Sequence, residues 1–174
     1  TVVQDFLDIS RIEQGKMKYD FSVFNFSELT YAVAEELTPN IERKGLRSKL
    51  EIEPNITVYA DSGKIRQVIE NLIDNALKYT PNGYITIALK KAGNSALLTI
   101  KDTGVGIKPE VLPKLFQKFS RAEDASKANI LGTGLGLYVA KQLVEAQNGK
   151  VMAESGGEGK GSTFIVELPY VMDG

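Results

Sequence analysis

The sequence predicts an α+β fold with a mixed β-sheet. Some segments repeat apolar residues at steps of three and four, which is typical of helices, and others alternate apolar with polar residues, which is typical of strands. Several expected strands follow one another through short turns rather than through helical crossovers. Directly connected strands favour an α+β arrangement over a doubly wound parallel sheet.

The first 60 residues are expected to form two helices and three strands. Gly15 is a stop signal for the first helix, and Ser27 is a plausible N-cap of the second. Pro39 is expected to end or kink that second helix, because proline lacks the backbone N–H that a helix needs. The expected elements are a helix at 1–14, a strand at 17–23, a helix from about 27, and short strands at about 46–52 and 57–60.

The clearest helix of the chain is expected at residues 62–79. Apolar residues recur there from Ile65 to Ala76 at helical steps, and Asp61 or Ser62 can cap the N-terminus. The later elements are expected to be strands at about 84–91 and 95–101, a short helix ending within 115–119, a helix up to Asn148–Gly149, and strands at 150–155 and 162–168.

The composition excludes several kinds of chemistry. With no Cys and no His, the chain has no thiolate nucleophile, no Cys-type zinc site and no imidazole base. Catalysis would rest on carboxylates, amides, Lys, Arg, hydroxyls and a hard cation such as Mg²⁺. The net charge of −1 gives no basic field for nucleic acid. No apolar run approaches a membrane span, and the opening residues lack an initiator Met and a signal peptide, so we expect a piece of a longer protein.

The stretch "ILGTGLGL" places Gly132, Gly134 and Gly136 two residues apart, just before an expected helix. It is interpreted either as a turn that begins the helix or as a phosphate site, because helix N-termini offer free backbone N–H groups. A dinucleotide-binding fingerprint is not favoured, since a polar segment rather than a strand precedes the glycines. The Gly-Lys-Ser/Thr ending of a P-loop is missing.

Two further groups of residues carry possible chemistry. Asn71, Asn75 and Lys78 share one helix face, which is either solvated or a site for Mg²⁺ and phosphate. Asp102 directly follows an apolar strand and precedes two glycines at positions 104 and 106. It either caps a turn or accepts a hydrogen bond from an exocyclic amine, with the glycines leaving room for a planar base.

Four motifs in order, "NLIDNALKYTP", "DTGVGI", "LFQKF" and "GTGLGL", closely resemble the N box, first glycine box, F box and second glycine box of sensor histidine kinases. Their ATP-binding domain belongs to a superfamily shared with gyrase, mismatch-repair and heat-shock chaperone ATPases. The similarity covers about residues 25–170. It implies a two-layer α/β sandwich of the Bergerat type, with a mixed sheet of about five strands packed against about three helices and a mobile ATP lid at 120–131.

The resemblance assigns roles to individual residues. It implies that Asn75 binds Mg²⁺, that Asn71 and Lys78 organise the phosphates of ATP, and that Arg121 reaches a phosphate. Phe116 and Phe119 resemble the anchors of the F box. The residues that it assigns to ATP binding are Asn75, Lys78, Tyr79, Asp102, Gly104, Gly106, Ile107, Gly132, Thr133, Gly134, Leu135, Gly136, Leu137 and Thr163.

The family transfers the γ-phosphate of ATP to a histidine on a helical dimerization domain, and this chain has no His. Residues 1–14 resemble the end of the second helix of that domain, 15–24 a linker strand and 25–170 the catalytic domain. The resemblance implies an acceptor helix upstream, a response regulator as downstream partner, and a homodimeric, cytoplasmic parent that a membrane anchor could hold. We expect this fragment to be monomeric and unable to phosphorylate itself on histidine.

Two alternatives to a histidine kinase stay open at this point. One is a nucleotide-binding module without transferase activity, and the other is an anti-sigma-type serine kinase of the same superfamily. Hydrolysing relatives place a Glu where this chain has Asn71, and a neutral amide cannot act as a general base. Glu70 is adjacent but points elsewhere on the helix, so we expect weak ATPase activity.

Overall fold

The computed structural model describes residues 2–118 and 134–172. Its elements in chain order are α1 (Val2–Glu13), β1 (Ser22–Asn25), α2 (Phe26–Arg43), β2 (Arg47–Ile52), β3 (Thr57–Ala60), α3 (Ser62–Tyr79), β4 (Tyr84–Ala92), β5 (Ser95–Asp102), the short 3-10 helix η1 (Leu112–Lys114), α5 (Gly136–Glu145), β6 (Lys150–Glu154) and β7 (Ser162–Pro169). The expected lid at 120–131 lies outside the described residues, as do the predicted site residues Phe119, Arg121, Gly132 and Thr133.

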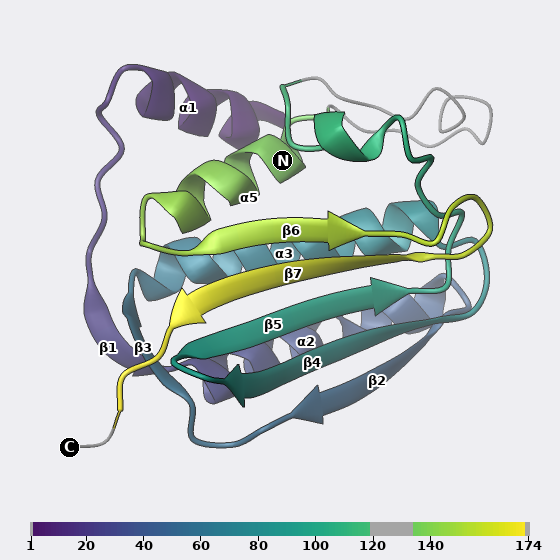
Figure 1. The fold of residues 1–174 in the computed structure, drawn as a ribbon, viewed down its shortest axis with the longest axis horizontal. Coiled ribbons are helices and arrows are strands. Elements are labelled where there is room, and N and C mark those ends of the chain that lie inside the picture. The colour runs from purple at the N-terminus through teal and green to yellow at the C-terminus, as the bar shows by residue number, and fades with distance from the viewer. Residues whose placement is uncertain (1, 119–133, 173–174) are drawn as a thin grey trace.

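The main sheet has five strands in the order β2-β4-β5-β7-β6 (Figure 1). Strands β2 and β4 are parallel, and the other three pairs are antiparallel. Two of these antiparallel pairs join strands that follow one another in the chain, β4 with β5 and β6 with β7. The expected α+β fold with a mixed sheet is therefore confirmed.

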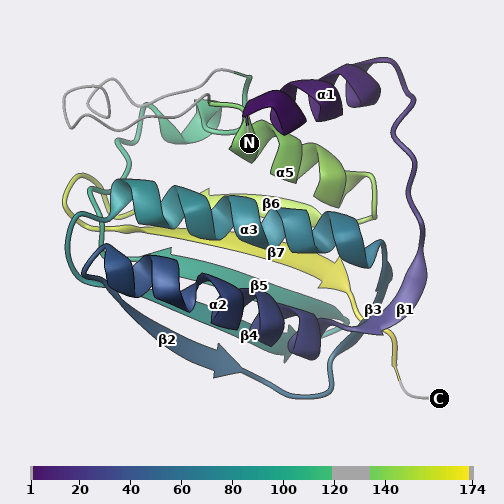
Figure 2. The same ribbon diagram turned by 180° about the vertical axis from the view of Figure 1, so that it is seen from behind.

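Helices α2, α3 and α5 cover one face of the sheet, and α1 lies over α5 on the side away from the sheet (Figure 2). Strand β5 shows why one face is covered, because its buried residues alternate with partly exposed ones. Ala96, Leu98 and Ile100 are fully buried and pack into the core against the helices. Full burial of such an aliphatic side chain contributes about 1.5–3 kcal/mol.

Helix α3 forms where the sequence predicts it. Asp61 is its N-cap and accepts a hydrogen bond from the backbone N–H of Lys64, 3.1 Å away. Ile65, Ile69 and Leu72 are fully buried, so the predicted apolar stripe is the face that meets the core. The polar residues of the N box, Asn71, Asn75 and Lys78, lie on the less buried side of this helix.

The structure corrects two expectations about α2. Asn25, not Ser27, is its N-cap and accepts the backbone N–H of Glu28 at 2.9 Å. The Ser27 hydroxyl instead donates to the carbonyl of Glu53 at 2.6 Å and so ties the helix start to the β2–β3 connection. Pro39 does not end the helix, which continues to Arg43. Burial of Ile41 in the core favours the extra turn despite the lost hydrogen bond.

The expected strand at 17–23 is shorter than its alternating pattern suggests. Only Ser22–Asn25 pairs, with Thr57–Ala60, and this pair forms a separate two-stranded sheet. Met17 and Tyr19 are partly buried and pack against the core from an extended segment. Alternating burial therefore produced the pattern without a neighbouring strand.

Candidate functional site

The candidate site is built by the C-terminal half of α3, the loop that follows β5 and the N-terminus of α5. Asn71 of α3 donates from Nδ2 to the carbonyl oxygen of Gly136, 3.2 Å away, at the start of α5. Gly134 has a φ of +69°, a left-handed conformation that glycine adopts without strain. The N box and the described part of the second glycine motif therefore lie side by side.

The polar face of α3 runs along this junction. Asn71 and Asn75 are half-buried and Lys78 is exposed. Their spacing of four and three residues puts them on one face, about 10 Å from first to last along the helix axis. This face can offer two amide groups and one ammonium group to an anionic ligand. Glu70 directly precedes Asn71 but lies on another face of α3, where its Oε1 is 4.0 Å from Nη1 of Arg66.

Asp102 ends the central strand β5 and is 3% exposed. Its Oδ1 accepts the backbone N–H of Gly104 at 2.8 Å and that of Ser162 at 3.3 Å. The Ser162 hydroxyl lies 3.1 Å from Oδ2. Burial raises the pKa of Asp102, and these hydrogen bonds to the carboxylate lower it in part. The two backbone hydrogen bonds therefore hold this buried carboxylate in place through Oδ1.

The loop after Asp102 packs so tightly that glycine is required at two positions. A Cβ on Gly104 would lie 2.1 Å from the carbonyl oxygen of Tyr79, at the end of α3. Gly106 has a φ of +74°, and its Cβ would lie 2.0 Å from the carbonyl oxygen of Gly157. Val105 donates to the Tyr79 carbonyl at 2.9 Å. The loop is therefore clamped between α3 and the turn that joins β6 to β7.

Other predicted residues have mainly structural surroundings in the described part of the site. Ile107 is 8% exposed, and its N–H donates to the Ser155 hydroxyl at 3.0 Å. Leu135 is fully buried and can face a ligand only with its backbone, whereas Leu137 is partly buried and packs against the core. Phe116 packs edge-on against Phe164 with ring centroids 6.3 Å apart, which anchors the F box.

The structure brings Ser162, rather than Thr163, to the Asp102 carboxylate. Thr163 is opposite Lys101 in the β5–β7 register, while Ser162 is opposite Asp102. Successive strand side chains point to opposite faces, so Thr163 lies on the face away from the helices. The sequence does contain a signal for this placement. Ser162 lies two and four residues before the core residues Phe164 and Val166, so its side chain points to the same buried face of β7.

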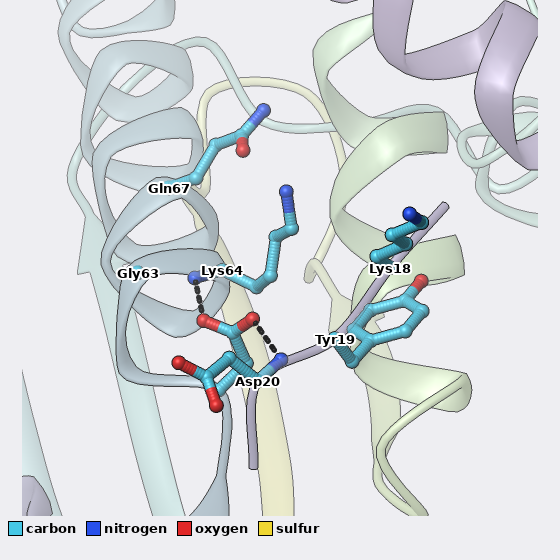
Figure 3. A pocket seen from close by; sticks show the side chains of 7 residues that line it. Lys18, Tyr19, Asp20, Gly63, Lys64 and Gln67 are labelled. Carbon is cyan, nitrogen blue, oxygen red and sulfur yellow. Dashed lines mark hydrogen bonds between the residues drawn. The ribbon is translucent and has the colours of Figure 1, made fainter. Parts of the chain in front are cut away.

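A depression of about 440 Å³ lies at the other end of α3 (Figure 3). Its lining residues are Lys18, Tyr19, Asp20, Asp61, Gly63, Lys64 and Gln67. Asp61 Oδ2 accepts the backbone N–H of Asp20 at 2.8 Å while Oδ1 caps α3 (Figure 3). The contacts there hold the segment after α1 against α3, and none of the predicted ligand-binding residues lines it.

Helix α1 is held on the domain by a buried carboxylate. Asp8 is fully buried and accepts hydrogen bonds from Gln4 at 2.9 Å and from Gln67 of α3 at 2.6 Å. Glu13 at the end of α1 pairs with Lys118, within the F box. None of the described helices is long and apolar enough to cross a membrane.

Several known proteins are similar in sequence to this chain over nearly its whole length. Hybrid signal transduction histidine kinase L of Dictyostelium discoideum is 37% identical over 98% of this chain, and autoinducer 2 sensor kinase/phosphatase LuxQ of Vibrio parahaemolyticus is 34% identical over 97%. The chain spans only 10% and 20% of the length of these two relatives.

Solved structures share the fold. Full-length ShkA, crystallised with AMPPNP, superposes with a TM-score of 0.85 at 28% identity, over 98% of this chain and 35% of that one. The catalytic domain of histidine kinase ThkA superposes with a TM-score of 0.73 at 26% identity, over 86% of this chain and 95% of that one. Residues 60–172, well over half of the chain, match the family model, so the chain belongs to the histidine kinase-, DNA gyrase B- and HSP90-like ATPases.

Proposed function

We propose that this chain is the ATP-binding catalytic part of a two-component sensor histidine kinase, which transfers the γ-phosphate of ATP to a histidine outside residues 1–174. The observation that carries the proposal is the junction of three segments at one end of α3. The buried Asp102, the polar face of Asn71, Asn75 and Lys78, and the start of α5 lie next to one another. This junction offers a base site beside a phosphate site.

At the base end, Asp102 would accept a hydrogen bond from the adenine amino group through Oδ2. Its Oδ1 already accepts two backbone N–H groups, whereas the Ser162 hydroxyl is the donor nearest to Oδ2. The glycines at 104 and 106 let the loop pack closely against the end of α3 and the β6–β7 turn, which would fix the backbone beside Asp102 for a planar ring. The AMPPNP bound to full-length ShkA supports a nucleotide as the ligand of this fold.

At the phosphate end, the residues fit a magnesium-bound triphosphate. Asn75 offers a neutral oxygen ligand from a half-buried position, and Lys78 offers an exposed ammonium group. The described residues hold no group of three or more Asp or Glu that could bind a metal alone. Mg²⁺ keeps several waters and takes few protein ligands, so one Asn together with phosphate oxygens is a suitable set. When bound, the ion would neutralise charge on the phosphates.

Transfer would need an acceptor from another segment, because the 174 residues contain no histidine. An incoming imidazole nitrogen would form a bond to the γ-phosphorus as the bond to the β,γ-bridging oxygen breaks, which leaves ADP. Phosphoryl transfer asks the protein mainly for positioning and charge neutralisation. In the proposal, α1 is the end of the dimerization helix of a cytoplasmic homodimeric parent, and a response regulator receives the phosphoryl group.

Hydrolysis by water would be slow in this site. The Asn71 amide donates to a carbonyl and cannot take a proton from water. Glu70 lies beside Arg66 on a different face of α3. These positions favour transfer to a protein acceptor over ATPase activity.

Calorimetric titration of AMPPNP into the chain, with and without Mg²⁺, tests the proposal. We expect Mg²⁺-dependent binding that Asp102→Asn abolishes and that Asn75→Ala makes much less dependent on Mg²⁺. Ser48→Ala, on the distant edge strand β2, serves as a control and should bind as the wild type does. A folded wild-type chain that does not bind AMPPNP would overturn the proposal.

Transfer itself is tested in a second experiment. The chain is mixed with [γ-³²P]ATP and an acceptor helix pair that carries a histidine, taken from a histidine kinase of the family. Acid-labile, base-stable label on the acceptor supports the kinase. Nucleotide binding without any transfer would favour a nucleotide-binding module instead.

A further inference from the structure

Thr80 is a buried polar residue at the point where α3 ends and the chain turns toward the base site. It is the C-cap of α3, with an extended backbone at φ −118° and ψ 93°. Its side chain is fully buried, and its hydroxyl oxygen makes no hydrogen bond. Within the described ranges, Thr30 of α2 is the only other residue with such a buried unpaired side-chain atom. A buried hydroxyl without a partner is costly, so its retention needs a physical reason.

The surroundings of Thr80 belong to the base site. The preceding residue, Tyr79, accepts the N–H of Val105 with its carbonyl oxygen, at 2.9 Å. Gly104 packs against the same carbonyl, since a Cβ there would lie 2.1 Å from it. Burial raises the pKa of Asp102, and the groups that lower it include the Thr80 side chain as well as Gly104 and Ser162. The same Cβ on Gly104 would lie 2.8 Å from Asp102 Oδ1, so the end of α3 that carries Thr80 and the Asp102 carboxylate meet at Gly104.

The hydrogen bonds of Asp102 are unevenly divided between its two oxygens. Oδ1 accepts two backbone N–H groups, from Gly104 and Ser162. The Ser162 hydroxyl is shared, at 3.4 Å from Oδ1 and 3.1 Å from Oδ2. A ligand amine that binds Oδ2 would compete with this hydroxyl. The carboxylate would then need another donor to stay in place.

We propose that Thr80 is a positioning residue of the base site, whose buried hydroxyl donates to the Asp102 carboxylate when Oδ2 accepts the amino group of a purine. The inference rests on the proposed function, because it requires a nucleotide with an exocyclic amine at Asp102. Thr80 acts through Asp102 and does not touch the base, since its side chain has no exposed surface. Its effect is therefore selective for ligands that use the amine contact.

The test compares ADP with inosine diphosphate, whose base carries a carbonyl in place of the amine. Calorimetric titrations are made with the wild type, Thr80→Val and Thr80→Ser. We expect Thr80→Val to weaken ADP binding about tenfold, the effect of losing one hydrogen bond to a charged group. Inosine diphosphate binding should change less than twofold. Thr80→Ser, which keeps the hydroxyl, should restore the wild-type preference for ADP.

Thr30→Val is the matched control, because Thr30 is also fully buried with an unpaired hydroxyl but lies in α2. It should leave the preference for ADP unchanged. If Thr80→Val does not fold, Thr80→Ala measures the same preference. An equal loss for both nucleotides, or no loss for either, would overturn the role of Thr80.

Failure of the proposed function gives a different result. In that case the folded wild type binds neither nucleotide, or Asp102→Asn leaves the preference for ADP intact. A wild type that prefers ADP through Asp102 while Thr80→Val keeps the same preference refutes the role of Thr80 alone.

Discussion

Asn71 donates a hydrogen bond to the carbonyl oxygen of Gly136, 3.2 Å away, and so joins the N box to the first residue of α5. The amide matters because it supplies a donor to the backbone, which a carboxylate cannot do. The residue that we expect to distinguish this site from that of the hydrolysing relatives is thus also a link between two helices. The start of α5 is held against the polar face of α3 at this point.

Asn71→Asp is expected to destabilise the chain by about 1–2 kcal/mol, because a carboxylate would face a carbonyl in place of a donor. Urea denaturation at neutral pH measures the free energy of unfolding. Asn94→Asp, in the exposed turn between β4 and β5, is the matched control and should cost less than about 0.5 kcal/mol. Equal losses for the two variants would contradict the structural role of the Asn71 contact.

Gly104→Ala is expected to cost at least about 2 kcal/mol and to abolish nucleotide binding, because its Cβ would overlap the Tyr79 carbonyl. Chemical denaturation and calorimetric titration measure the two effects. Gly63→Ala tests the method, since its Cβ would meet only an Asp61 oxygen at 3.4 Å in the first turn of α3. That control should keep binding and gain up to about 1 kcal/mol from helix propensity. A Gly104→Ala variant that binds normally would show that the loop can move aside.

Asp102→Asn is expected to make the chain more stable at neutral pH while removing nucleotide binding. Burial raises the pKa of Asp102 above its ordinary 3.8, so the folded state binds a proton more tightly than the unfolded state. Stability from this group is therefore greatest at low pH and falls as pH rises through the folded pKa. Asn keeps an oxygen that can accept the N–H groups of Gly104 and Ser162.

The difference in unfolding free energy between wild type and Asp102→Asn should accordingly shrink as the pH falls from 7.5 to 4.5. Denaturation curves at several pH values measure it. A variant that is less stable than the wild type by the same amount at every pH would contradict burial as the dominant influence on this carboxyl.

Asp8→Ala is expected to loosen α1 from the rest of the chain. The substitution leaves the Gln67 amide without its 2.6 Å acceptor and removes the one to Gln4, at a cost of about 1–3 kcal/mol. Hydrogen exchange followed by mass spectrometry should show faster exchange in α1 with little change in β5. Ser10→Ala, on the exposed side of α1, should exchange like the wild type. Uniformly faster exchange throughout the chain would show that α1 is part of the core folding unit.

The fold could be predicted where local signals and burial agree. Helix α3 has a capping Asp61 and an unbroken apolar stripe, so its bounds and buried face follow from the sequence. Pro39 was expected to end or kink the second helix, but the helix runs past it to Arg43 because the later residue Ile41 is buried in the core. Position 27 was misleading for the same kind of reason, since the Ser27 hydroxyl bonds to Glu53, 26 residues away.

The site could be predicted only as far as motifs reach. Asn71 contacts Gly136 of the second glycine motif, and Asp102 contacts Gly104, whereas the roles of these residues with a nucleotide stay predictions. Ser162 was missed because its contact with Asp102 depends on the register between β5 and β7. Register is set by pairing across the sheet and shifts every side chain to the other face with a one-residue slip. No short motif records that information.

Asp102 ends β5, the middle strand of the five, which is paired on both sides along its length. Such a strand separates from its neighbours only when the whole sheet comes apart, whereas edge strands and helix ends open locally. The carboxylate is thus fixed to the most persistent part of the molecule. A nucleotide held by it would protect the chain as a whole, so binding would raise the midpoint of thermal unfolding with the logarithm of ligand concentration.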